Sequence, residues 1–181
     1  MSSFQWVSGA AMLATSISAA ATQYATPEEA AKRCFPEATA FKDSTAQLSP
    51  DDMRAVAAAS GLPARTANWR VMQAFSGDQL LGTVVFDGVI GKYEVIDYAV
   101  GIAADGKVRQ IEILNYRESH GYEVRLPAWR KQFVGKGPDA KLRVGEDIAN
   151  ISGATLSTTN ITDGVRRIVA VVATLKANGK V

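Results

Sequence analysis

The chain has 181 residues, of which 47% are hydrophobic and 21% are charged. This length and composition are typical of one globular domain that buries a hydrophobic core. The net charge of +2 is small and the Lys and Arg residues are scattered, so no nucleic-acid partner is expected.

The first 21 residues differ from the rest because they contain no charged side chain. Residues 6–17 are moderately apolar, and the alanines at 19–21 fit the cleavage site of a secretory signal. We therefore predict a signal peptide over residues 1–21 and a mature domain over residues 22–181. The mature domain would be periplasmic or otherwise extracytoplasmic, either free or associated with a membrane. The start of the segment lacks Lys and Arg, so an alanine-rich helix packed on the domain remains the alternative.

Two short helices are predicted next. Residues 26–29 form a capping-box pattern, with a threonine, a proline at the first helical position and a glutamate at the third, and this helix should stop before Pro36. Residues 49–52 begin a second helix by the same pattern, and Gly61 ends it. Because the second helix is rich in alanine, we expect it to pack closely against a sheet. Cys34 is the only cysteine and cannot form an internal disulfide, so we interpret it as a small buried apolar residue.

From residue 68 onward the apolar residues alternate with polar ones. This pattern predicts β-strands over residues 69–72, 80–86, 92–103 and 108–114. The Asp105-Gly106 pair is typical of a hairpin turn between the last two strands. In the last strand the two isoleucines should face the core, while Gln110 and Glu112 face water. The pattern indicates a half-buried antiparallel sheet.

A polar loop at residues 115–121 follows the last strand and contains His120, the only histidine. One histidine without carboxylate or cysteine partners at suitable spacing does not make a metal site, so no metal ligand is predicted. His120 can be a polar loop residue or a contact to a bound cofactor, and the sequence leaves both open.

Residues 127–133 are predicted to form a short helix that ends at Gly135. Trp129 and Phe133 lie four residues apart on one face of it, and we interpret them as core aromatics.

The last helix is marked by apolar residues at helical spacing from Ile161 to Leu175. Its start can lie anywhere between Thr155 and Asn160, because several residues there can cap a helix.

Residues 152–158 read Ser-Gly-Ala-Thr-Leu-Ser-Thr and lead into that last helix. Small residues let another molecule approach the backbone, and the free N–H groups of a helix start favour a phosphate. Taken alone, such a motif is usually only a capped helix start. The run resembles the flavinylation motif of FMN-binding domain proteins. That family includes small extracytoplasmic subunits of the sodium-pumping NADH:quinone reductase and of the Rnf complex.

Three upstream segments agree with this resemblance, which extends over roughly Phe35 to Leu175. Residues 35–38 match a Phe-Pro-x-Ala turn, and residues 118–121 match a Glu-(Ser/Thr)-x-Gly segment that lies near the flavin in the family. Residues 129–136 match a Trp-x-x-Gln-Phe-x-Gly-Lys run. The element pattern and the resemblance together predict an α+β fold, with a mainly antiparallel sheet flanked by short helices and a long C-terminal helix.

The resemblance implies that FMN is attached through its phosphate to Thr155 by a separate FAD-dependent flavin transferase. No Lys, His, Asp or Glu lies between Ser152 and Asn160 to activate a hydroxyl, which agrees with modification by an outside enzyme. The cofactor-binding residues predicted in this way are Ser152, Gly153, Ala154, Thr155, Leu156, Ser157, Glu118, Ser119, His120 and Gly121. No residue is assigned a catalytic role. The family often has an acidic residue three positions before the motif serine, where this chain has Ala149, so covalent and noncovalent FMN both stay open.

We therefore expect an exported FMN-carrying electron-transfer protein that accepts electrons from a membrane-bound reductase or quinol system. It would be a redox carrier rather than a stand-alone enzyme, because the cofactor supplies the electron chemistry. A flavin-binding regulatory or sensor module and a flavin-free structural subunit are the alternatives. The sequence does not decide the oligomeric state.

Overall fold

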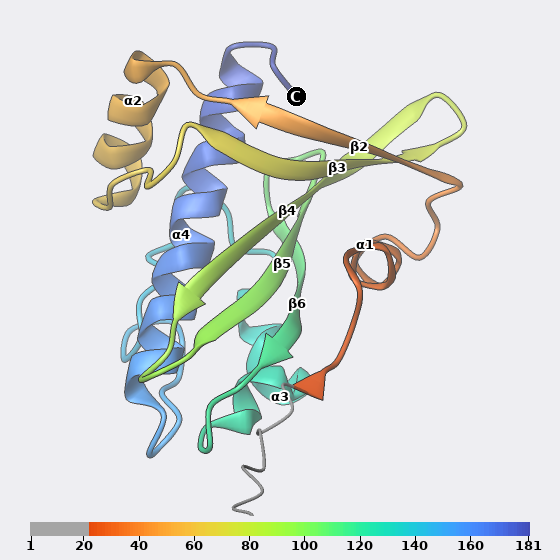
Figure 1. The fold of residues 1–181 in the computed structure, drawn as a ribbon. Helices are drawn as coiled ribbons and strands as arrows, with labels where there is room; N and C mark the ends of the chain where they lie inside the picture. The colour runs from red at the N-terminus through yellow and green to blue at the C-terminus, as the bar shows by residue number, and fades with distance from the viewer. Residues whose placement is uncertain (1–21) are drawn as a thin grey trace, which may run out of the picture.

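The computed structural model describes residues 22–181, and the predicted signal peptide over residues 1–21 lies outside that part of the chain. Figure 1 shows a twisted antiparallel sheet whose strands lie in the order β1-β6-β5-β4-β3-β2. The strands are β1 (Thr22–Gln23), β2 (Ala40–Gln47), β3 (Asn68–Ser76), β4 (Gln79–Ile90), β5 (Val95–Ala103) and β6 (Val108–Tyr116). The helices are α1 (Pro27–Cys34), α2 (Pro50–Ser60), α3 (Pro127–Arg130) and α4 (Thr155–Ala177), with single 3-10 turns at Tyr122–Arg125 and Lys131–Phe133. The α+β prediction is confirmed.

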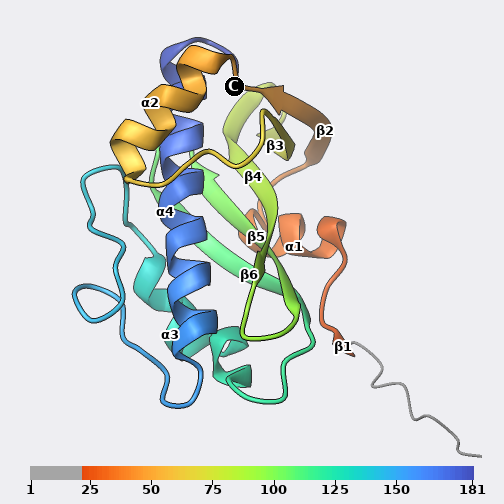
Figure 2. The same cartoon turned by 60° about the vertical axis from the view of Figure 1, so that its left-hand side comes forward.

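Helix α4 is the longest element and crosses one face of the sheet (Figures 1 and 2). Its buried apolar stripe comprises Ile161, Val165, Ile168, Val172 and Leu175. Burying one such side chain stabilises the fold by roughly 1.5–3 kcal/mol, so the stripe fixes α4 firmly on the sheet. The helix begins at Thr155, which resolves the start that the sequence left open.

Helix α1 lies on the opposite face of the sheet (Figure 1). The predicted capping box is present: Thr26 Oγ1 accepts the Glu29 N–H at 3.2 Å, and the Glu29 carboxylate accepts the Thr26 N–H at 2.9 Å. Cys34 is buried so close to Gly101 that a Cβ there would lie 2.8 Å from the Cys34 Cβ. Burial, and then the charge of Glu112, raise the pKa of the Cys34 thiol to about 12. The interpretation of Cys34 as a small buried residue is confirmed.

Helix α2 has the predicted ends, with a Ser49 capping box and a left-handed Gly61, but its predicted packing is wrong. It packs on α4 and not on the sheet (Figure 2). Alanines surround this helix on several sides and define no face, so Val56, which is fully buried, decides which side turns inward. Ala55 and Ala58 remain exposed.

The four predicted strands correspond to β3, β4, β5 and β6, but several of their ends were placed wrongly. Strand β2 was not predicted, because it is an exposed edge strand with few apolar residues. Strand β4 continues through Asp87 and Gly88, beyond the end predicted at residue 86. Both residues pair with β5, and Asp87 accepts a hydrogen bond from Tyr98 Oη at 2.9 Å. Strand β5 begins at Val95 and not at Lys92. The Asp105-Gly106 turn between β5 and β6 is confirmed.

Glu112 was expected to face water and is instead buried, with 3% of its surface exposed. Helix α1 and the α3 segment cover this side of β6, and each contributes a cation. Arg130 forms an ion pair with Glu112, and Arg33 lies 3.5 Å from its carboxylate. Gln110, half-buried, donates a hydrogen bond to Glu112 at 2.6 Å. The expectation of a sheet that is solvated on one face fails here, because helices cover both faces.

Candidate functional site

Three segments that are distant in the sequence meet at the lower end of α4 in Figure 1. They are the β4–β5 turn at residues 91–94, the loop after β6 at residues 117–121, and the start of α4. Together they enclose a pocket of about 450 Å³, within the usual size range of small-molecule sites. Its lining comprises Lys92, Tyr93, Glu118, Ser119, His120, Gly153, Ala154, Thr155, Leu156 and Ser157. The structure thus brings together all predicted site residues except Ser152 and Gly121, while their role in binding FMN stays a prediction.

Thr155 is the first residue of α4, and its side chain is exposed. The Asn150 amide donates a hydrogen bond to Thr155 Oγ1 at 3.1 Å. Asn150 is itself held by the Thr158 hydroxyl, which donates to its Oδ1 at 2.7 Å. Asn150 therefore orients the one hydroxyl on which the predicted attachment depends. Sequence reasoning did not assign it a role.

The start of α4 is open toward the pocket. Its N-cap residue is Ala154, which makes no side-chain hydrogen bond to the helix. The first N–H groups of a helix have no partner inside the helix, so here they can serve an anion in the pocket. Gly153 has φ +80°, and no atom lies within 4 Å of the place that a Cβ would occupy, so the approach to these groups is unobstructed. Leu156, which is 52% exposed, adds an apolar surface beside Thr155.

Glu118 lines the pocket, but its carboxylate is already engaged. Glu118 Oε1 accepts the backbone N–H groups of Tyr93 at 2.7 Å and Glu94 at 3.0 Å. Desolvation would raise the pKa of Glu118, but these backbone donors, that of Lys92 and the Lys92 charge together hold the pKa below its usual range. The side chain is thus a stable anion that ties the loop after β6 to the 91–94 turn.

Gly121 and Tyr116 do not line the pocket but contact residues that do. Gly121 has φ +82°, and a side chain there would collide with Ala154 and lie 2.8 Å from Tyr116 Oη. Tyr116 Oη donates to the carbonyl of His120, which fixes the loop backbone. Burial raises the pKa of the Tyr116 hydroxyl above its ordinary value. The His120 side chain is exposed and lines the pocket, which keeps both of its interpretations open.

The Trp129 segment supports the site without lining the pocket. Trp129 and Phe133 are buried, with ring centroids 5.0 Å apart at 70°, which confirms their interpretation as core aromatics. Trp129 Nε1 donates to the carbonyl of Ala149 at 2.9 Å, and Gln132 Oε1 accepts the Ala149 N–H at 2.7 Å. Both backbone groups of Ala149 are therefore clamped, and this clamp sets the position of Asn150 and the motif after it.

Lys92 and Tyr93 are pocket residues that sequence reasoning placed inside a strand. They lie on the turn because β4 runs on to Ile90 and β5 starts only at Val95. The Gly91-Lys92 pair was a usable turn signal, but nothing local indicates that this turn meets the start of α4. The Lys92 ammonium lies 4.9 Å from the centroid of the Tyr93 ring.

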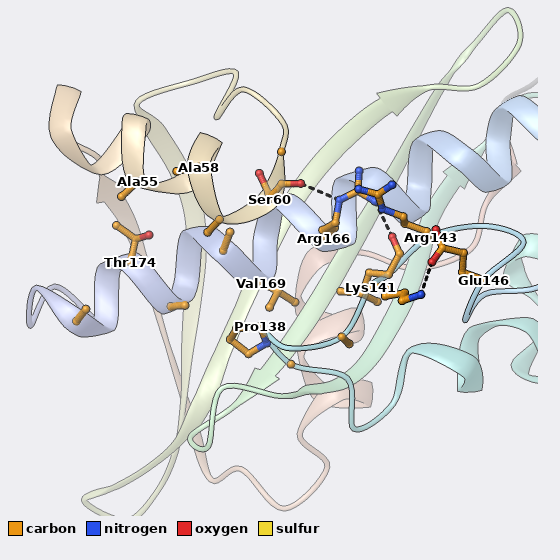
Figure 3. A pocket seen from close by; sticks show the side chains of 18 residues that line it. Ala55, Ala58, Ser60, Pro138, Lys141, Arg143, Glu146, Arg166, Val169 and Thr174 are labelled. Carbon is orange, nitrogen blue, oxygen red and sulfur yellow. Dashed lines mark hydrogen bonds and ion pairs between the residues drawn. The ribbon is translucent and has the colours of Figure 1, made fainter.

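A larger pocket of about 750 Å³ lies between α2, α4 and residues 137–146 (Figure 3). Two of its charged side chains, Arg166 and Lys141, are already engaged within the protein. Arg166 donates to the carbonyls of Ser60 at 3.0 Å and Leu142 at 2.7 Å, and Lys141 pairs with Glu146 at 2.8 Å. Size alone does not make a site, and this pocket contains no exposed hydroxyl at an uncapped helix start of the kind seen at Thr155. We therefore assign the candidate site to the smaller pocket.

Within residues 22–181, no helix is long and apolar enough to cross a membrane. The same part of the chain contains no cluster of three or more His, Cys, Asp or Glu side chains arranged to hold a metal ion.

A family model described as FMN-binding domain matches residues 91–170, a segment that contains every residue lining the pocket. Among solved structures, the chain is similar to NqrC from Shewanella oneidensis, with 16% sequence identity and a TM-score of 0.50. That likeness covers 81% of this chain and 88% of the other, and at this identity it concerns the fold. No curated protein matches the chain.

Proposed function

Residues 91–170 belong to the FMN-binding domain family, and from this premise we propose an exported electron carrier with FMN in the pocket at the start of α4. In this proposal the FMN phosphate is esterified to Thr155. The observation that carries it is the exposed Thr155 hydroxyl, which lies at an uncapped helix start and opens into a pocket of suitable size.

The pocket residues fit the parts of FMN. A phosphate on Thr155 would lie at the free N–H groups of α4, where the helix dipole favours negative charge. The Asn150 amide, now donating to Thr155 Oγ1, would orient the ester oxygen. Leu156 and Tyr93 offer exposed apolar surface for the ring system. When bound, FMN supplies the electron chemistry, while the chain supplies its position and electrostatic surroundings.

In the described part of the chain, the hydrogen bond that reaches Thr155 Oγ1 comes from an amide, and none joins it to His120, Lys92 or Glu118 in the pocket. The hydrogen bond from Asn150 leaves Thr155 Oγ1 an acceptor and removes no proton from it. Glu118, the pocket carboxylate, is occupied by backbone N–H groups. A threonine hydroxyl needs an adjacent base or a metal to become a good nucleophile, so we propose that a separate FAD-dependent flavin transferase provides this activation.

Export and the electron donor are further parts of the proposal. The uncharged residues 1–21 support export, and the family resemblance supports a membrane-bound reductase or quinol system as donor. Sequencing the N-terminus of protein recovered from an extracytoplasmic fraction tests the first part. Steady-state reduction by a membrane reductase tests the second, and a flavin that is never reduced at a useful rate would favour a sensor instead.

Intact-mass analysis tests the attachment. Full-length protein made beside a flavin transferase should gain the mass of one FMN linked as a phosphoester. Thr155→Ala should abolish the adduct, whereas Thr159→Ala, a change in the same helix but outside the pocket lining, should retain it. An adduct that survives Thr155→Ala would reject attachment at this residue. FMN that co-purifies without an adduct would replace covalent attachment by noncovalent binding.

A further inference from the structure

The β4–β5 turn at residues 91–94 forms one wall of the proposed FMN pocket. The sequence motif at residues 152–158 gave no indication that this turn takes part. Lys92 and Tyr93 both line the pocket, together with residues 153–157 at the start of α4. Tyr93 is 73% exposed, the most exposed of the large hydrophobic side chains in the described part of the chain. An aromatic ring left in water beside a pocket is a surface on which a planar ligand can stack.

Two features fix the shape of this turn. Gly91 N–H donates to the carbonyl of Glu94 at 2.8 Å and closes the turn. The Glu118 carboxylate then accepts the N–H groups of Tyr93 and Glu94 from outside. Gly91 is required at its position, because a Cβ there would collide with Glu118 Oε1 and lie 3.0 Å from Ile96 Cδ1.

Glu118 comes from the loop after β6 and belongs to a different element from the turn. Its Oε1 oxygen is used by backbone groups, so it does not offer that oxygen to a ligand. Its effect on a bound flavin would therefore pass through the turn. The exposed Tyr93 side chain would lose its defined position if these two hydrogen bonds were absent.

We propose that Glu118 is a positioning residue, whose carboxylate holds the 91–94 turn so that the Tyr93 ring stacks on the isoalloxazine ring of FMN. The Lys92 ammonium lies over one face of the Tyr93 ring, 4.9 Å from its centroid, and the other face would stack on the flavin. This inference rests on the proposed function, because it needs FMN in the pocket. It assigns Tyr93 a direct contact with the cofactor and Glu118 an indirect role.

Flavin fluorescence tests the stacking, because a tyrosine ring in contact with isoalloxazine quenches its emission by electron transfer. In full-length flavin-loaded protein, Tyr93→Leu should raise the fluorescence per flavin by roughly threefold or more, since the aromatic contact is lost. Tyr93→Trp should keep the emission low, because tryptophan stacks and quenches as well. Unchanged fluorescence in Tyr93→Leu would overturn the stacking.

A double-mutant cycle tests the positioning role. Glu118→Ala should raise the fluorescence in the wild-type background and add little in the Tyr93→Leu background, since both changes remove the same contact. Glu118→Gln keeps an acceptor oxygen and should fall between wild type and Glu118→Ala. Equal effects of Glu118→Ala in both backgrounds would show that Glu118 acts on the flavin independently of the turn, and would overturn the proposal.

Two other measurements distinguish a failure of the proposed function from a failure of the stacking proposal. The intact mass of each variant reports whether FMN is attached, and a wild-type protein without any FMN would overturn the proposed function and the stacking with it. Amide hydrogen exchange in flavin-free protein tests the hydrogen bonds that anchor the turn to Glu118, whether or not FMN is bound. The Tyr93 and Glu94 amides should be protected in wild type and exchange faster in Glu118→Ala. Equal exchange in the two proteins would reject the anchor itself.

Discussion

Gly121 lies directly against Ala154, so that a single methyl group added to Gly121 would overlap the Ala154 Cβ. This contact joins the loop after β6 to the N-cap of α4, the two segments that carry the sequence motifs of the site. Because Gly121 also has φ +82°, its conformation and the space around it both demand glycine.

Gly121→Ala should therefore open the pocket. We expect the variant to lose about 2 kcal/mol or more of unfolding free energy, because backbone strain and a clash act together. Gly145→Ala is the matched control, since Gly145 has φ +84° but nothing within 4 Å of an added Cβ. Denaturant melts and FMN content of both variants check this, and equal behaviour would mean that the contact with Ala154 does not matter.

Asn150→Ala should slow the formation of the FMN adduct. The amide of Asn150 is the group that orients Thr155 Oγ1, and without it the hydroxyl can rotate among its rotamers. We expect a decrease of roughly tenfold in the initial rate of transferase modification, as for a misoriented nucleophile. Time-resolved intact-mass analysis measures this. Asn178→Ala, which removes an amide far from the pocket, should leave the rate unchanged.

Ala149→Asp restores the acidic side chain that the family often has at this position. The Ala149 side chain is exposed, and only its backbone is held by Trp129 and Gln132, so the substitution should be tolerated. If the transferase reads that carboxylate, the adduct should form faster than in wild type. Ala149→Asn, similar in size without the charge, is the control, and an equal rate in all three proteins would show that the charge is not recognised.

Lys92→Gln should lower the midpoint potential of the bound flavin. Reduction adds electrons to the ring, and a nearby ammonium favours the reduced form. Water screens the interaction between a surface ammonium and the reduced ring, so we expect this interaction to contribute about 1 kcal/mol. Its loss corresponds to a decrease of roughly 20 mV in the midpoint potential of a two-electron couple. Lys136→Gln, a substitution outside the pocket lining, is the control, and potentiometric titration followed by absorbance makes the comparison.

Lys180 should stabilise the fold only at pH values where Asp52 is ionised. The Lys180 ammonium, 2.6 Å from Asp52, and then the backbone of Ser49 lower the pKa of Asp52 from 3.8 to about 2. A depressed folded-state pKa contributes stability that is present above the unfolded value and is lost as the pH falls through the folded value. Lys180→Gln should therefore melt below wild type at pH 6, and the difference in Tm should shrink between pH 4 and pH 2. A difference that does not depend on pH would contradict this pairing.

The sequence by itself determined the features whose causes are local. The capping boxes at Thr26 and Ser49, the Asp105-Gly106 turn and the apolar period of α4 depend on neighbours within a few residues, and all are present. The motif at 152–158 was recognised by its resemblance to a known family together with three upstream segments, while its own residues left the helix start open between Thr155 and Asn160.

Tertiary structure alone decided which distant segments share the pocket and which side chains are buried. Glu112 is buried because α1 and α3 both cover β6, and no alternation along one strand can report that. Tyr93 reaches the pocket because β4 extends beyond Gly88 and the resulting turn is held by Glu118, 25 residues further along the chain. Such placements come from pairing and packing between distant elements, for which the local pattern of residues carries no signal.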